Sequence, residues 1–417
     1  MSALDFLSDN RKVLIGLLSS AVRGEVYQPG DCTGIDWQAV YDEAVRHQVM
    51  PLLYPQLAEI GGSMGIPEAL LEKWRINALY EGMVQEQNYI GTGKVLEQFS
   101  NSGIPVIALK GLVLRDLYPH PCLRTMCDAD LLVKPGDMDR AGRVLKEAGY
   151  ALYFTNGKHT VYSHEVLPYI ELHRTLVPEE EFVDMADFEA EVWSRALTVN
   201  INGAEVLSLC RQDEVLFLLL HMASHIISSG FGLRQLCDLL LVLEADKDKI
   251  NLEEILDTPA LLQIEKFTKV ILSICHILFD IDFPGVNHIL VLQDYSLVRS
   301  FTEDIFEGGV YGNSSSEYFA ANRMIYYSGG EKANNPLKRF IYLFNFLFPS
   351  VEKLDIRYNY AKKHRCLLPL AWVHRLYYSM VRKDLRFVDK SAVFASMSPT
   401  EIYSKRSVLL RQLGLLD

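Results

Sequence analysis

Two aspartates one residue apart are the first feature of this chain with chemical potential. Asp128 and Asp130 lie in the run DADLLV, residues 128–133, which alternates as a β-strand does. Alternate side chains of a strand share a face, so both carboxylates project together while Ala129 and Leu131 point into a core. Carboxylate oxygens are the ligands that Mg²⁺ prefers. The pattern therefore predicts a magnesium site on one face of this strand.

A third acid lies downstream. In the segment PYIELHRTL, residues 168–176, the alternation places Glu171 and His173 on one face. If this strand lies beside the Asp128 strand, Glu171 joins the two aspartates. Such a triad holds one or two Mg²⁺ ions, which neutralise charge on a transferring phosphoryl group and orient the attacking oxygen. Glu171 is therefore predicted to complete the metal site or to act as the base for an acceptor.

A lysine-glycine turn precedes the aspartates. Lys110 and Gly111 end an apolar strand-like run and open a helical pattern. A helix N-terminus favours phosphate, and glycine lets the backbone approach a ligand, so we predict that both residues contact a nucleotide triphosphate. Arg124 is four residues before Asp128. Its planar fork either reaches phosphate or forms a salt bridge that orients one of the aspartates.

Two histidines accompany the predicted acidic strands. His173 shares the face of Glu171, and His159 lies on the preceding strand-like run. Each either holds substrate or orients a carboxylate, although a histidine on a sheet face is more often a structural residue. Both readings stay open at this point.

Two pairs with a spacing of four residues occur further along the chain. His221 and His225 have metal-ligand spacing, but the glutamate of the H-E-x-x-H motif is missing between them. We expect them to pack a helical region against the catalytic unit. Arg234 and Asp238 are expected to form an ion pair along one helix.

A resemblance to a known family rests on five stretches: LKG at 109–111, Tyr118-Pro119, Arg124, DADLLV at 128–133 and IELH at 170–173. They resemble the uncharacterised bacterial nucleotidyltransferases of the polymerase-β-like superfamily, most densely over residues 100–245. The resemblance implies a small mixed sheet with helices on one side, two catalytic aspartates, a third carboxylate and Mg²⁺. The chain departs from the wider pattern at the Lys-Gly turn, where most members have Gly-Ser or Gly-Gly. It also has a longer gap before the aspartates.

The hydrophobic periodicity divides the chain into three parts. Residues 1–98 form an N-terminal helical segment, 99–205 a nucleotidyltransferase α+β core, and 206–417 a C-terminal helical region with a subdivision near 329–336. Strands are expected at 104–109, 127–133, 150–155, 159–163, 168–176 and 198–207. The predicted fold class is therefore α+β, a small mixed-sheet polymerase-β-like nucleotidyltransferase core flanked by helical segments.

Composition narrows the class of protein. No segment has the pattern of a signal peptide, and no uncharged apolar stretch is long enough to span a membrane. Seven cysteines without a C-x-x-C pair indicate reduced thiols in a cytoplasm. The net charge is −12, yet residues 332–390 hold thirteen Lys or Arg against four Asp or Glu. These cations are either solvated helix faces or a surface that meets phosphates, nucleic acid or an acidic partner.

The leading hypothesis is a cytoplasmic Mg²⁺-dependent nucleotidyltransferase, with Mn²⁺ as the alternative metal. It would transfer a nucleoside monophosphate from an NTP to a hydroxyl-type acceptor, whether small molecule, nucleic acid or protein, and release pyrophosphate. The alternative is a catalytically inactive nucleotide-binding or scaffold protein with the same fold, which the unusual Lys-Gly turn keeps open. Three acids facing one another favour the enzyme. A nucleic-acid-binding protein acting through the basic region is a weaker third hypothesis, because no RNA- or DNA-binding signature accompanies it.

Overall fold

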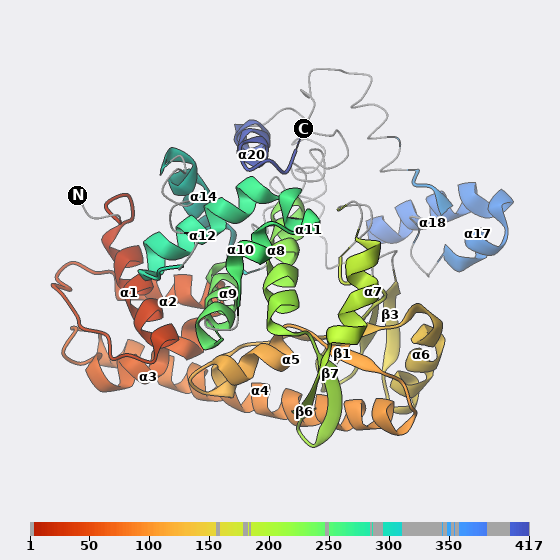
Figure 1. Ribbon diagram of the computed structural model, residues 1–417, viewed down its shortest axis with the longest axis horizontal. Coiled ribbons are helices and arrows are strands. Elements are labelled where there is room, and N and C mark those ends of the chain that lie inside the picture. Colours follow the sequence, from red (N-terminus) through yellow and green to blue (C-terminus); the bar gives the residue numbers. More distant parts are fainter. Residues whose placement is uncertain are drawn as a thin grey trace.

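One twisted sheet and two groups of helices make up the described chain (Figure 1). The computed structural model describes residues 4–155, 159–177, 182, 185–246, 250–283, 286, 295–310, 344, 348–351, 354, 358–381 and 401–416. The mixed sheet and its flanking helices confirm the predicted α+β class. None of the described helices combines the length and the apolar character that a membrane crossing requires.

The sheet has seven strands in the order β3-β4-β5-β2-β1-β7-β6. The strands are β1 (Val106–Ala108), β2 (Asp128–Val133), β3 (Ala151–Thr155), β4 (His159–Ser163), β5 (Tyr169–His173), β6 (Leu197–Ile201) and β7 (Ala204–Ser208). β2 runs parallel to β5 and β1 runs parallel to β7, whereas the other neighbours are antiparallel. The two strands that carry the predicted acids are therefore direct neighbours at the centre of the sheet.

The single strand expected at 198–207 is wrong. This segment is a hairpin of β6 and β7, which turns at Asn202 and Gly203 with φ values of 47° and 91°. Asn-Gly is the dipeptide that best tolerates positive φ at both central positions of a two-residue hairpin turn. The alternation of apolar and polar residues continues through both strands of the hairpin, so the sequence pattern did not reveal the turn between them.

The two faces of the sheet have different coverings. On one face, Ala129 and Leu131 pack with side chains of α4 (Glu68–Asn101) and α6 (Met138–Glu147). On the other face, Leu132 packs with α7 (Ala186–Arg195) and with Phe217 of α8 (Arg211–Ser228). The resemblance implied helices on one side only, but here α7 and α8 also cover the face that bears the acids. The acidic residues therefore lie between the sheet and α8.

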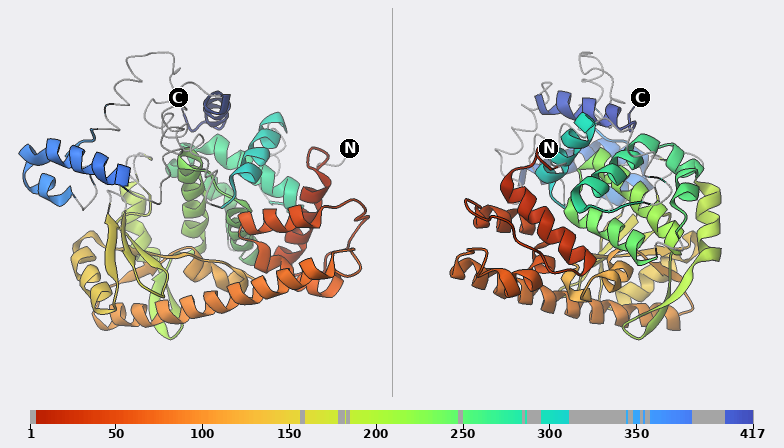
Figure 2. Two further views of the ribbon diagram at one scale, coloured as in Figure 1. Left: turned by 180° about the vertical axis from the view of Figure 1, so that it is seen from behind. Right: turned by 60° about the vertical axis from the view of Figure 1, so that its left-hand side comes forward.

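The longest helix, α4, underlies both parts of the molecule. In Figures 1 and 2 it runs along the base, beneath the sheet at one end and beneath α3 (Met50–Ile60) at the other. Trp74 belongs to the core of the helical part, whereas Leu96 and Phe99 belong to the core beneath the sheet. One continuous helix thus fixes the sheet relative to the helices.

The N-terminal and C-terminal helices share one hydrophobic core. It is formed by α3, α8, the first part of α4 and the helices α1 (Asp9–Arg23), α2 (Trp37–Arg46), α9 (Leu233–Ala245), α10 (Leu252–Leu256), α11 (Pro259–Leu262), α12 (Glu265–Phe279), α14 (Tyr295–Gly308) and α20 (Glu401–Gln412). Across this core the Ser19 hydroxyl and the Arg23 guanidinium of α1 both donate to the Phe279 carbonyl, at 3.0 and 2.9 Å. We call this assembly the helical body.

A small separate cluster forms around α17 (Asn359–Lys363) and α18 (Leu368–Val381). These helices carry part of the basic region 332–390. The subdivision expected at 329–336 lies outside the described residues, as does much of that basic region. All seven cysteines are free thiols.

An acid is buried in the first turn of α8. Glu214 is 0% exposed, and neither of its carboxylate oxygens has a hydrogen-bond partner within the described part of the chain. Burial, reinforced by the negative charge of Asp238, raises the pKa of Glu214 to about 8 despite the nearby Arg211 and Arg124 cations. A protonated carboxyl avoids the large cost of burying an unpaired charge. Glu214 is therefore neutral near pH 7.

Replacing Glu214 with Gln is expected to flatten the pH dependence of stability. Between its ordinary pKa and about 8, the folded protein holds a proton that the unfolded chain has released. The free energy of unfolding thus falls as pH rises, by about 1.4 kcal/mol per pH unit for one such group. Glu214→Gln removes this loss. Urea unfolding at about pH 5.5 and about pH 7.5 measures it, and wild type should lose roughly 2–3 kcal/mol more than the variant.

The matched control is Glu253→Gln, an exposed glutamate in α10. This control should keep the wild-type pH dependence. Equal pH dependence in wild type and Glu214→Gln would show that Glu214 ionises normally in the folded protein.

Candidate active site

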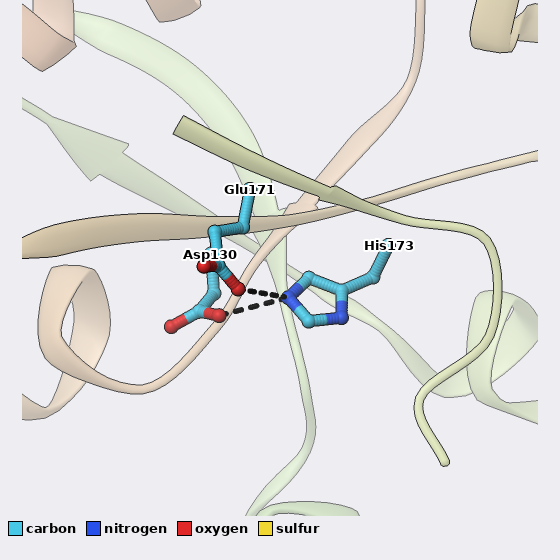
Figure 3. Close-up of side chains that lie close together, drawn as sticks. All are labelled: Asp130, Glu171 and His173. Carbon is cyan, nitrogen blue, oxygen red and sulfur yellow. Dashed lines mark hydrogen bonds and ion pairs between the residues drawn. The ribbon is translucent and has the colours of Figure 1, made fainter. Parts of the chain in front are cut away.

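Two acids and a histidine converge where β2 and β5 lie side by side. The parallel register pairs Asp130 with Glu171, so their side chains share one face of the sheet. His173 Nε2 is 2.8 Å from Asp130 Oδ1 and 3.7 Å from Glu171 Oε2 (Figure 3). One ligand atom from each of the three residues lies within 4.8 Å of the others. A single metal ion at this point would be within reach of all three.

Asp128 lies two residues earlier on the same face of β2, where it pairs in register with Tyr169. It is not a member of the tight group formed by Asp130, Glu171 and His173. The carboxylate of Asp128 nevertheless interacts electrostatically with those of Asp130 and Glu171. Strand alternation thus predicted that the three acids share one face of the sheet. In the structure His173, rather than Asp128, is the third member of the tight group with Asp130 and Glu171.

Lys110 supplies the nearest positive charge. It follows the end of β1, and its Nζ lies 2.9 Å from Asp130 Oδ1, with only 15% of the side chain exposed. Its backbone has φ 49° and ψ −121°, a left-handed conformation that favours glycine. Such backbone strain costs on the order of 1–3 kcal/mol and persists where the surroundings enforce it. Here the strained turn delivers the Lys110 ammonium to Asp130.

The acids are crowded enough to shift one another's ionisation. Burial favours protonation of Asp130, but Lys110 and His173 outweigh it and hold the pKa of Asp130 well below its ordinary value. Burial and the charges of Asp130 and Asp128 raise the pKa of Glu171 to about 8. Burial and Asp130 also raise the pKa of Asp128. Full ionisation of the cluster would therefore leave more negative charge than its neighbouring cations balance, and a divalent cation would relieve that excess.

Arg124 forms a buried ion pair with the helical body. Its Nη2 and Nε donate to the two carboxylate oxygens of Asp238 in α9, at 2.7 and 3.2 Å, and Tyr118 donates to the same carboxylate at 2.8 Å. Both charged side chains are almost fully buried. Of the two roles weighed for Arg124, a salt bridge is present, although to Asp238 rather than to Asp128 or Asp130. Gly111 makes room for it, because a Cβ at that position would collide with Arg124 Nη1.

The expected helical ion pair between Arg234 and Asp238 is wrong. Arg234 Nη1 instead donates to the Thr125 carbonyl at 3.0 Å and to the Gln48 side chain. Asp238 is already held by the fork of Arg124 and by Tyr118, and two buried charge-assisted bonds exceed what one pair along a helix contributes. The expectation considered only neighbours within one helix.

Several backbone contacts position the segment that leads into Asp128. Gln85 of α4 accepts a hydrogen bond from Met126 N at 2.9 Å and donates to Met126 O at 3.3 Å. The Thr125 hydroxyl donates to the Gln48 carbonyl at 3.0 Å. Sequence reasoning missed Gln85 and Gln48, because amide side chains that hold a distant backbone leave no pattern in the sequence.

Two cavities meet at the acidic cluster. The larger, of about 330 Å³, is lined mainly by polar residues: Lys110, Asp128, His159, Glu171, His173, Thr175, His221, Ser224 and His225, with Leu176 and Val177. The smaller, of about 140 Å³, includes Lys110, Gly111, Arg124, Asp128, Asp130, His221, His225, Arg234 and Asp238 in its lining. The cluster is therefore accessible from two sides.

The histidines of α8 lie against both cavities. His221 and His225 pack ring against ring, with centroids 4.3 Å apart. Burial, together with the Lys110 charge, holds the pKa of His221 well below its ordinary value. These residues place the helical body over the sheet as expected, and they also form part of the cavity wall. His159 Nε2 is 3.9 Å from Glu171 Oε2. His159 lies on β4 and Lys110 follows β1, so these two residues flank the paired strands β5 and β2 from opposite sides.

The sheet places Asp130 and Glu171 on adjacent strands, an arrangement of acids that suits a metal ion and chemistry on phosphates. A family model described as uncharacterised nucleotidyltransferase matches residues 33–280, well over half of the chain. The chain belongs to this nucleotidyltransferase family. The match extends from just before α2 to the end of α12, so it includes α8 and α9 as well as the acidic strands. Comparison with curated proteins and with solved structures finds no match.

Breaking the Arg124–Asp238 pair from one side is expected to be costly. Asp238→Leu leaves a guanidinium buried without its anion, which destabilises a protein by about 3–5 kcal/mol. The double variant Arg124→Met with Asp238→Leu should recover part of that loss, because no unpaired charge remains. Urea unfolding of both single variants and the double variant gives the coupling energy.

The exposed pair Arg299–Glu303 in α14 is the matched control. Its coupling energy should be below about 1 kcal/mol, as for other solvent-exposed pairs. A coupling at Arg124–Asp238 as small as this would mean that the buried pair does not hold the sheet to the helical body.

Proposed function

We propose that this protein is a divalent-metal-dependent nucleotidyltransferase. It transfers a nucleoside monophosphate from an NTP to a hydroxyl-type acceptor and releases pyrophosphate. The observation that carries the proposal is the pairing of Asp130 with Glu171 on parallel strands, with Asp128 on the same face and Lys110 against Asp130. Membership in a nucleotidyltransferase family supports the reaction class.

The donor set fits a hard divalent cation. Asp130 and Glu171 supply carboxylate oxygens and Asp128 lies beside them. Burial, together with the neighbouring negative charges, raises the pKa values of Glu171 and Asp128. Both Mg²⁺ and Mn²⁺ take such carboxylate oxygens. A metal ion bound there would neutralise charge on the transferring phosphoryl group.

The protein side chains have separate roles in this scheme. Asp128 and Asp130 hold the metal, and Glu171 completes that site or accepts the proton of the acceptor hydroxyl. A metal ion held by Asp130 would offset the charge of that carboxylate and would leave the Lys110 ammonium available to phosphate. His173 and His159 orient the carboxylates that they approach, Asp130 and Glu171. His221 and His225 on α8 form part of the wall of both cavities.

The direct test is a screen for pyrophosphate release. The full chain is incubated with each of the four NTPs, Mg²⁺ or Mn²⁺, and candidate acceptors. Release that Asp130→Asn abolishes supports the enzyme. NTP binding with no release under any condition would favour the alternative, a catalytically inactive nucleotide-binding or scaffold protein.

Mg²⁺ is expected to raise the thermal midpoint of unfolding. A ligand that binds only the folded state stabilises it by mass action, and relief of repulsion among the carboxylates adds to the effect. The paired substitution Asp128→Asn with Asp130→Asn should abolish this metal-dependent gain, even if it stabilises the metal-free protein. Differential scanning fluorimetry with increasing Mg²⁺ measures both.

The control for this titration is Glu253→Gln with Glu254→Gln, two exposed acids of α10. It removes the same charge and should keep the wild-type response. A midpoint that ignores both Mg²⁺ and Mn²⁺ in wild type would count against the metal site.

Lys110→Met should weaken NTP binding roughly tenfold to a hundredfold. The variant keeps the apolar stem and loses one charge-assisted hydrogen bond, worth about 1.5–3 kcal/mol. Nucleoside monophosphate binding should change far less, because the lost contact is to the β- or γ-phosphate. Calorimetric titration with a non-hydrolysable NTP and with the monophosphate separates these effects.

Lys134→Met is the control, because Lys134 lies at the far end of β2 and stacks on Trp193 away from both cavities. Equal losses for both ligands in Lys110→Met would place Lys110 near the α-phosphate or the nucleoside. No loss for either would leave it the structural partner of Asp130 alone.

A further inference from the structure

Arg234 differs from the arginines that are buried in the described part of the protein, because it lies at a cavity and is only partly buried. Arg115, Arg124 and Arg406 are each buried and each forms an ion pair with a carboxylate, namely Glu86, Asp238 and Asp304. Arg234 forms no ion pair within the described residues, and its buried Nε has no hydrogen-bond partner. Part of the Arg234 side chain is exposed, but a cation with a buried and unpartnered Nε and no anion is costly, so this arrangement points to a missing negative ligand.

The hydrogen bonds of Arg234 fix its direction without neutralising its charge. Its Nη1 donates to two neutral acceptors, the Thr125 carbonyl and the Gln48 side chain. The nearest carboxylate on its own helix, Asp238, is held by Arg124 and Tyr118. The guanidinium is therefore oriented in advance and retains its full positive charge.

The side chain lines the smaller of the two cavities. Lys110, the Gly111 turn and Arg234 share this cavity of about 140 Å³ with Asp128 and Asp130. Arg124 also contributes to the lining, but Asp238 already neutralises it. The cavity thus combines an acidic side, where a metal ion is proposed, with a cationic side, where Arg234 interacts with Asp238 and Asp128 at longer range but forms an ion pair with neither. A metal-bound polyphosphate has the charge pattern that matches both sides.

We propose that Arg234 forms an anion subsite that binds the terminal phosphates of the nucleoside triphosphate. This inference rests on the proposed function and assigns one ligand to each of the two cavities. The triphosphate occupies the cavity of Arg234, and the acceptor approaches through the larger cavity lined by His159, Thr175 and Ser224. The planar fork of arginine suits two oxygens of one phosphate.

The test is calorimetric titration of the full chain with inorganic tripolyphosphate in excess Mg²⁺, followed by the nucleoside monophosphate. Wild type should bind tripolyphosphate, and Arg234→Gln should weaken that binding at least tenfold. Arg234→Lys should give an intermediate loss, because it keeps the charge without the fork. Monophosphate binding should stay within about twofold of wild type in both variants.

Arg211→Gln is the matched control. Arg211 opens α8 much as Arg234 opens α9, but it pairs with Asp246 and lines neither cavity. This control should bind tripolyphosphate as wild type does. If Arg234→Gln does not fold, Arg234→Lys and the rise in the thermal midpoint of wild type with tripolyphosphate still decide the question.

The outcomes separate this subsite from the proposed reaction. Wild type that does not bind tripolyphosphate, or Arg234 variants that bind it unchanged, would overturn the subsite even if pyrophosphate release is observed. Tripolyphosphate binding that depends on Arg234, in a protein that releases no pyrophosphate from any NTP, would support the subsite and remove the reaction.

Discussion

The buried ion pair between Arg124 and Asp238 is the interaction on which the site geometry depends. It connects the segment before β2 to α9, two parts of the chain separated by 114 residues. Because both charges are enclosed, separating them would leave each one buried without its counterion. The pair therefore helps to fix the position of the sheet relative to the helical body. Gly111 follows from this pair, since a side chain there would displace the guanidinium. Arg124 and Tyr118 already occupy the Asp238 carboxylate, so Arg234 does not pair with it.

A second constraint is the distribution of charge over the acidic face. Lys110 and His173 both approach the same oxygen of Asp130, while Glu171 and Asp128 receive less compensation. The result is one carboxylate that stays ionised beside two that resist ionisation. A protein selected only for stability gains nothing from this arrangement, because well-packed apolar residues would avoid the desolvation cost. The strained backbone of Lys110 adds to that cost at the same point.

The local part of this site was readable from the sequence, and the non-local part was not. Strand periodicity is a property of a few consecutive residues, so it correctly placed Asp128 and Asp130 on one face and Glu171 with His173 on another strand. The parallel pairing that brings Asp130 beside Glu171 then confirmed the predicted neighbourhood of the strands. By contrast, the partner of Arg124 lies on α9, and the contacts of Arg234 come from Gln48 and Thr125. A sequence pattern has no means of specifying such distant contacts.

The same limit applies to the flanking helices. The helical patterns before and after the α+β core were recognised as separate segments, but hydrophobic periodicity identifies an apolar face without naming what covers it. In the structure those faces cover one another, and α4 continues from the helical body to the sheet. A hint was present in α9, where Arg234 and Asp238 interrupt a strongly apolar run. Charges inside such a run need buried partners. Asp238 has its partner in Arg124 across the domain, whereas Arg234 forms no ion pair with any residue that the structure describes.

This division of the molecule also separates reaction chemistry from substrate choice. β2 and β5 contribute the acids that the proposed metal site requires. The helical body contributes Arg234, His221, Ser224 and His225, and these residues form the walls against which the two ligands must fit. Under the proposed function, substitutions in α8 or α9 can therefore change the acceptor specificity or the affinity for phosphate without disturbing the carboxylates. Because α9 is fixed by the Arg124–Asp238 pair, such changes act on cavities whose position relative to the acids is already determined.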